Sequence, residues 1–143
     1  MRWIDRAGDC ARRYQQNRKE LGRMKRYRRK RHEIPSRGGI QKPVEAEVLS
    51  CCDENRAVQL EREIDAVEWA FAKIRQIADS GTTVSERDIA RNTARLAEVV
   101  YIKRSHGVMG ASVLLNFSDR TATRYNKIFL RLVAARMGFL ECS

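Results

Sequence analysis

Apolar residues recur every three or four positions along most of the chain, and this spacing predicts helices. The clearest case runs from about Pro43 to Asp79, where one apolar stripe consists of Leu60, Ile64, Val67, Phe71, Ile74 and Ala78. Pro43 suits a first helical turn, and Gly81 is expected to end the helix by tolerating a left-handed conformation. The stripe favours a face packed on its own domain, and a coiled-coil dimer seam is the alternative.

A second helix is predicted to start at Ser85 and to end near Arg104. Ser85 and Asp88 have the spacing at which each side chain can meet the other's backbone N–H at a helix N-terminus. The expected buried face consists of Ile89, Leu96, Val99, Val100 and Ile102. Gly107 then marks a turn.

Residues 108–135 read as a short helix, a tight turn and a longer helix. In the short helix, Met109 to Leu115, we expect Val113 and either Leu114 or Leu115 to point inward, while small Ala111 and Ser112 allow a close approach of the next helix. Asn116 tolerates positive φ at the turn. The residues expected to pack in the core, together with Tyr101 and Ile102 from the preceding helix, are Phe117, Ala122, Tyr125 or Asn126, Phe129, Leu132 and Val133.

The longer helix of this pair carries the candidate binding surface. Ser118 is expected to cap it and Asp119 to occupy its first position. The face opposite the apolar residues is rich in Arg, Lys and Thr, which suits phosphates and base edges in a DNA groove. The predicted DNA-binding residues are Ser118, Asp119, Arg120, Thr121, Thr123, Arg124, Lys127 and Arg131. A solvated helix face that binds nothing is the alternative interpretation.

The charge of the chain is +11, and it is unevenly distributed. Residues 1–43 carry 15 Lys and Arg against 4 Asp and Glu, residues 44–80 carry 4 against 9, and residues 81–143 carry 10 against 5. Two basic blocks therefore flank an acidic one, and a strongly basic protein attracts polyanions, nucleic acid above all.

The first 42 residues are predicted to form a basic N-terminal arm and a linker, followed by a helical domain over residues 43–143. Seven of the nine residues from Arg23 to Arg31 are basic, and Pro35-Ser-Arg-Gly-Gly is the linker. The arm is expected to bind nucleic acid, DNA or RNA, without sequence preference through Arg23, Lys25, Arg26, Arg28, Arg29, Lys30 and Arg31. The fold class is thus all-α, a helical bundle with a C-terminal helix-turn-helix and a basic arm.

The pattern of this helical pair resembles region 4 of sigma factors: a small residue, two apolar residues, a glycine-like turn residue, an apolar residue and Ser-x-x-Thr. Here Asn116 stands where that family has a turn glycine, Phe117 is the apolar residue, and Ser118 to Thr121 form the last element. More widely, residues 51–140 resemble phage late-gene regulators, namely the Q-type antiterminators of lambdoid phages and the RinA and ArpU activators. That resemblance rests on Cys51-Cys52-Asp53-Glu54, Tyr101, Gly107 and the helical pair after it.

These resemblances imply a phage late-gene transcription regulator that binds a double-stranded DNA site and engages the β-flap region of bacterial RNA polymerase. Antitermination is the preferred outcome, activation of initiation at a late promoter is the second, and sigma factor and nascent RNA are further candidate partners. Two other interpretations remain open. One is a small terminase-like packaging subunit with the stripe at residues 60–78 as its oligomeric stem, and the other is a structural or RNA-binding protein.

Several kinds of chemistry are not expected. His32 and His106 have no catalytic partner nearby in the sequence, Gly38-Gly39 is not followed by Lys-Ser/Thr, and we expect neither an enzyme nor a cofactor. A zinc site built from Cys10, His32, Cys51 and Cys52 is disfavoured because adjacent cysteines make poor tetrahedral ligands. The chain shows no apolar run long enough to span a membrane and no secretory signal, so we expect a protein of the bacterial host cytoplasm.

Overall fold

A computed structural model describes residues 2–33 and 43–140, and the side chains of residues 2–27 and 54–140. Those residues form six α-helices and a short π-helical segment: α1 (Trp3–Arg12), α2 (Tyr14–Glu33), α3 (Pro43–Ser80), α4 (Val84–Ala97), η1 (Glu98–Ile102), α5 (Val108–Leu115) and α6 (Asp119–Met137). The described part of the chain contains no strand. The expectation of an all-α helical bundle is confirmed.

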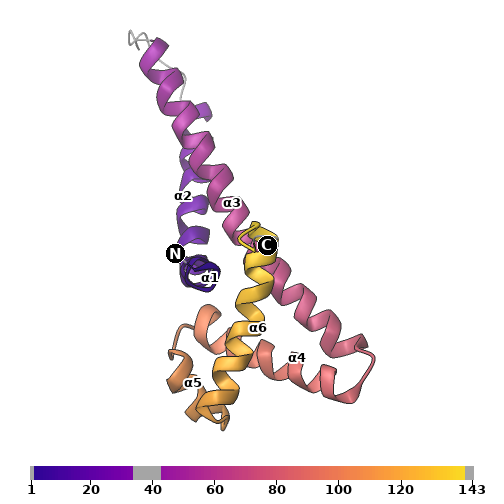
Figure 1. Cartoon of the computed structure of the whole chain (residues 1–143). Coiled ribbons are helices and arrows are strands. Elements are labelled where there is room, and N and C mark those ends of the chain that lie inside the picture. Colours follow the sequence, from indigo (N-terminus) through magenta and orange to yellow (C-terminus); the bar gives the residue numbers. More distant parts are fainter. Residues whose placement is uncertain (1, 34–42, 141–143) are drawn as a thin grey trace.

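The 38-residue helix α3 forms the spine of the molecule (Figure 1). Helix α2 runs beside the first half of α3. Together, α2 and this half of α3 extend away from the other helices. At the far end of α3 the chain reverses into α4, while α6 crosses α3 and also packs against α1 and α4. The small helix α5 lies at the end of the molecule opposite the tip of the α2–α3 pair.

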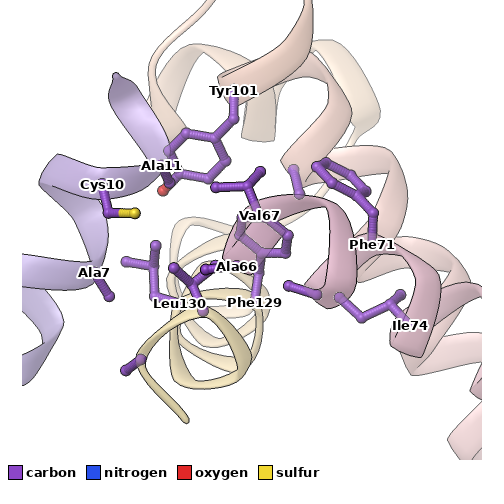
Figure 2. Close-up of a cluster of buried hydrophobic side chains, with 14 of the residues drawn as sticks. Ala7, Cys10, Ala11, Ala66, Val67, Phe71, Ile74, Tyr101, Phe129 and Leu130 are labelled. Carbon is purple, nitrogen blue, oxygen red and sulfur yellow. The ribbon is translucent and has the colours of Figure 1, made fainter. Parts of the chain in front are cut away.

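The core lies where α1, α3, η1 and α6 meet (Figure 2). Phe129 of α6 is fully buried, with its ring 4.8 Å from that of Phe71 and 5.3 Å from that of Tyr101, measured between centroids. Leu60, Val67, Phe71, Ile74 and Ala78 of the predicted α3 stripe are buried, and Ile64 is half-buried. The stripe is therefore a face covered by the chain's own helices, as the sequence favours, and not a dimer seam.

Helix α1 corrects the expectation of an arm for the first residues. Ala7, Cys10 and Ala11 have no exposed surface and belong to the same core cluster as Phe129. Small side chains on one face let α1 approach α6 closely, and small residues give a weak hydrophobic signal in the sequence. The basic surface that extends from the bundle consequently begins with α2. The expected linker, residues 34–42, lies outside the described residues.

Two helix ends also differ from expectation. Thr83, not Ser85, caps α4: its side chain accepts a hydrogen bond of 3.1 Å from the backbone N–H of Glu86. Gly81 follows α3 without a positive φ. Its lack of a side chain matters for another reason, because a Cβ there would lie 2.6 Å from the carbonyl oxygen of Ile77.

Within the described residues, no helix has the length and apolar character needed to cross a membrane.

Candidate nucleic-acid interface

The turn between α5 and α6 has the geometry that the sequence predicts. Asn116 adopts a left-handed conformation with φ 60° and ψ 42°. The N–H of Phe117 donates to the carbonyl of Ser112 at 2.8 Å, which closes the end of α5. Ser118 then caps α6, accepting a hydrogen bond of 3.2 Å from the N–H of Thr121. The two helices are thus joined by three residues.

One face of α6 fixes this helix in the bundle. Its buried residues are Ala122, Phe129, Leu130, Val133, Ala134 and Met137. Phe117 and Tyr125 form an edge-to-face pair with centroids 5.3 Å apart, at the border of a second small core beneath α5. At the other end, Arg62 of α3 donates to the carbonyl of Met137 at 3.1 Å, satisfying a carbonyl left free where the helix stops.

The opposite face of α6 carries a basic stripe. Arg120, Arg124, Lys127 and Arg131 follow one another at spacings of four, three and four residues, so they share one face of the helix. All four side chains are exposed. Within the described part of the chain none of them has an ion-pair or hydrogen-bond partner. Four unpaired cations in a row are available to a polyanion.

The other four predicted DNA-binding residues have partners within the protein. The hydroxyl groups of Ser118 and Thr121 lie 2.8 Å apart in the cap. Asp119 accepts a hydrogen bond of 3.1 Å from Ser112, and the hydroxyl of Thr123 donates to the carbonyl of Asp119 at 2.9 Å. These side chains shape the start of α6, so the structure divides the predicted set into a polar cap and a basic stripe.

Helix α5 overturns one expectation about the core. Val113 and Leu114 are not inward but 80% and 57% exposed, whereas Leu115 is half-buried and packs against the second small core. Ala111 and Ser112 form the buried face instead. Their small side chains let α5 lie close to α6, and this close packing turns the larger apolar residues outward. The signal in the sequence is the run from Val108 to Phe117, which contains no charged residue.

The second predicted surface lies on α2. Arg23, Lys25 and Arg26 are exposed, and none has a partner within the described residues. Arg28, Arg29, Lys30 and Arg31 belong to the same helix, but their side chains lie outside the described set. The structure does not bring these residues to α6: the start of α6 and the distal end of α2 lie at opposite ends of the molecule (Figure 1).

A buried polar cluster attaches the start of α2 to α3. The carboxylate of Glu63, whose side chain is only 7% exposed, accepts hydrogen bonds from Arg13 and, at 2.8 Å, from Asn17. The hydrogen bond to Glu63 raises the pKa of Arg13 above its ordinary value, so the guanidinium of Arg13 stays charged. Further along, Arg56 of α3 pairs with Glu20 of α2 at 3.2 Å.

Two titratable groups, Cys10 and Tyr101, are buried in the core. Burial raises the pKa of the Cys10 thiol to about 12. Burial likewise raises the pKa of Tyr101 to about 12. No group of three or more His, Cys, Asp or Glu residues that could hold a metal occurs among the described residues. The side chains of His32, Cys51 and Cys52 lie outside them.

A scan of the chain against protein-family models finds no match, and neither a search of curated proteins nor a search of solved structures finds one.

Proposed function

We propose that this protein binds double-stranded DNA through α6, with the helix lying in the major groove and reading sequence. The observation that carries this proposal is the stripe of four exposed, unpaired cations on a helix whose other face is fixed in the core. In such a geometry the first residues of the helix face base edges, and later ones face phosphates. Arg120 and Arg124 would pair with guanine, and Lys127 and Arg131 with phosphates.

The basic side chains of α2 supply a second, sequence-independent attraction. Exposed Lys and Arg that contact phosphates release counterions and add affinity for any duplex or single strand. This role needs no fixed orientation, and Lys25, Arg26 and Tyr27 are consecutive exposed residues around the helix surface. Nascent RNA is the other polyanion that such a surface would accept.

Within DNA-binding proteins, we place the chain among phage late-gene transcription regulators that engage RNA polymerase, with antitermination preferred over activation of initiation. This part rests on the resemblance of residues 51–140 described above. Packaging is the weaker alternative, because α3, whose stripe would serve as an oligomeric stem, is packed against α1, α2, α4 and α6.

Selection from a random duplex library tests the binding proposal. The parent protein should enrich a defined sequence, and Arg120→Ala and Arg124→Ala should each enrich none. Arg95→Ala is the matched control, because Arg95 is exposed on α4, outside the stripe. If both α6 variants enrich the parent's sequence, α6 does not read DNA. Transcription past a terminator downstream of that sequence, with and without the protein, then tests the regulatory role.

A further inference from the structure

Helix α5 presents an apolar patch to solvent. Its exposed side chains are Met109, Val113 and Leu114, with 51%, 80% and 57% of their surface accessible. The whole run from Val108 to Phe117 is uncharged in a chain that is 33% charged. A surface without cations does not suit a phosphate backbone, and contiguous exposed apolar side chains are typical of protein contacts.

A second apolar feature is a groove bounded by α3, α4 and α6, with a volume of about 590 Å³. Its apolar lining comes from all three helices and consists of Ile74, Ile77, Ile89, Ala90, Ile128 and Leu132. Lys73, Arg131 and Glu86 also line it, and neither of the two cations has a partner within the described residues. The groove is thus an apolar floor with two unpaired cations and one carboxylate beside it, which leaves a net positive rim.

The patch cannot fill the groove of its own chain. Helix α5 is fixed by its buried residues Ala111 and Ser112, and the three side chains of the patch are left exposed on its outer side. In Figure 1, α5 and the corner between α3 and α4 lie on different sides of α6. One molecule therefore carries a convex apolar surface and a concave one, each directed outward.

We propose that α5 of one copy of this chain docks into the α3–α4–α6 groove of a second copy, head to tail. Charge supports this occupant. Asp119, held against α5 by its hydrogen bond with Ser112, places a carboxylate beside the patch, while the groove offers Lys73 and Arg131 against the one carboxylate of Glu86. Opposite charges at the two rims favour this pairing, whereas α5 against α5 would bring two Asp119 carboxylates together.

The size of the contact determines how the association behaves. Three side chains entering one groove bury much less than the ~800 Å² per partner of a stable complex, so association in free solution is weak. A head-to-tail contact leaves a free patch and a free groove at the ends, so it continues into chains and does not stop at a dimer. Because Arg131 is also one of the cations proposed to contact phosphates, the contact between copies and DNA binding through α6 compete for this residue.

Sedimentation velocity without DNA tests this inference separately from the proposed DNA binding. Val113→Glu places a carboxylate in the apolar patch, and Ile89→Glu places one in the apolar groove. Each substitution adds one negative charge. Val58→Glu is the matched control, because Val58 is 63% exposed and belongs to neither surface. Circular dichroism checks folding, and Ile128→Glu replaces Ile89→Glu if that variant unfolds. The parent and Val58→Glu should form species that grow with concentration.

The mixture of the two variants gives the decisive result. Each variant alone should associate about tenfold or more weakly than the parent. Mixed in equal amounts, they retain one intact patch and one intact groove, so they should form dimers and nothing larger. A parent that stays monomeric at every concentration, a parent that stops at a dimer, or a mixture that stays monomeric would each overturn the inference. Unchanged association of Val113→Glu would do the same.

Discussion

Helices α2 and α6 are both basic, but the fold holds them differently. Six side chains of α6 are buried, its start is capped by Ser118, and its free cations lie in one stripe. Helix α2 is buried at Tyr14 and Asn17 near its start, and only half-buried at Leu21 and Met24. Exposed cations are enough to attract nucleic acid. Reading a sequence also requires that the helix carrying them has a fixed orientation.

The largest expected effect comes from removing the anchor of α6. Phe129→Ala leaves a cavity between Phe71 and Tyr101 and should cost about 3–5 kcal/mol, a large fraction of the stability of so small a protein. Leu21→Ala, at the half-buried interface of α2, should cost clearly less. Urea unfolding followed by circular dichroism measures both. Equal losses would mean that the two helices are anchored equally well.

Alkaline pH should lower the free energy of unfolding through Tyr101, which packs on Phe129 of α6. Burial raises the pKa of Tyr101 from 10.0 to about 12, so the folded state holds this proton more tightly than the unfolded chain does. This difference in pKa contributes on the order of 2–3 kcal/mol to the free energy of unfolding. The contribution is fully present below pH 10 and is lost as the pH rises through 12. In Tyr101→Phe, the free energy of unfolding should fall less steeply over that range. An identical pH profile would contradict this account.

The attachment of α2 depends on Glu63. Glu63→Ala leaves the buried amide of Asn17 without its acceptor and should cost about 1–3 kcal/mol. Hydrogen exchange should speed up in α2 while amides of α6 stay protected. Glu61→Ala, an exposed neighbour on α3, is the control. Equal loss of protection in both helices would show that α2 and α6 unfold as one unit.

A smaller effect is expected from the cap of α6. Ser118→Ala removes the acceptor for the N–H of Thr121 and should cost about 1 kcal/mol. Thr83→Ala at the start of α4 removes the same kind of cap and serves as its control. Thermal melting should show similar losses for the two, but only Ser118→Ala should also weaken DNA binding. If the two substitutions affect DNA binding equally, the Ser118 cap has no specific role in DNA recognition.

Much of this architecture can be predicted from the sequence, because long side chains at helical spacing give a strong signal. The α3 stripe, the left-handed Asn116 and the Ser118 cap are of this kind. The burial of α1 was not predictable in the same way, because Ala7 and Ala11 pack by being small. Ala111 and Ser112 likewise face the core because they are small, and Val113 is left exposed on the other side of α5. The groove is formed by three helices that are distant in the sequence, and no local sequence pattern predicts such a surface.

The cap of α4 shows a different limit. Thr83 and Glu86 have the same spacing as Ser85 and Asp88, so two helix starts compete within six residues. Both place a hydroxyl before an acidic residue, and local chemistry does not separate them. The structure starts α4 at Val84, where Thr83 caps it and Ala90, Thr93 and Leu96 become the buried face.

The central claim is that α6 reads sequence while α2 supplies only charge. It is tested most directly by the ratio of affinities for a selected duplex and a scrambled one, measured at several salt concentrations. Arg120→Ala and Arg124→Ala should each lower that ratio by about 1–3 kcal/mol and leave binding to the scrambled duplex largely in place. The triple change of Arg23, Lys25 and Arg26 to Gln should weaken both duplexes equally and flatten the salt dependence by about 0.9 per lost contact. A ratio that falls with the α2 change and survives the α6 changes would contradict the account.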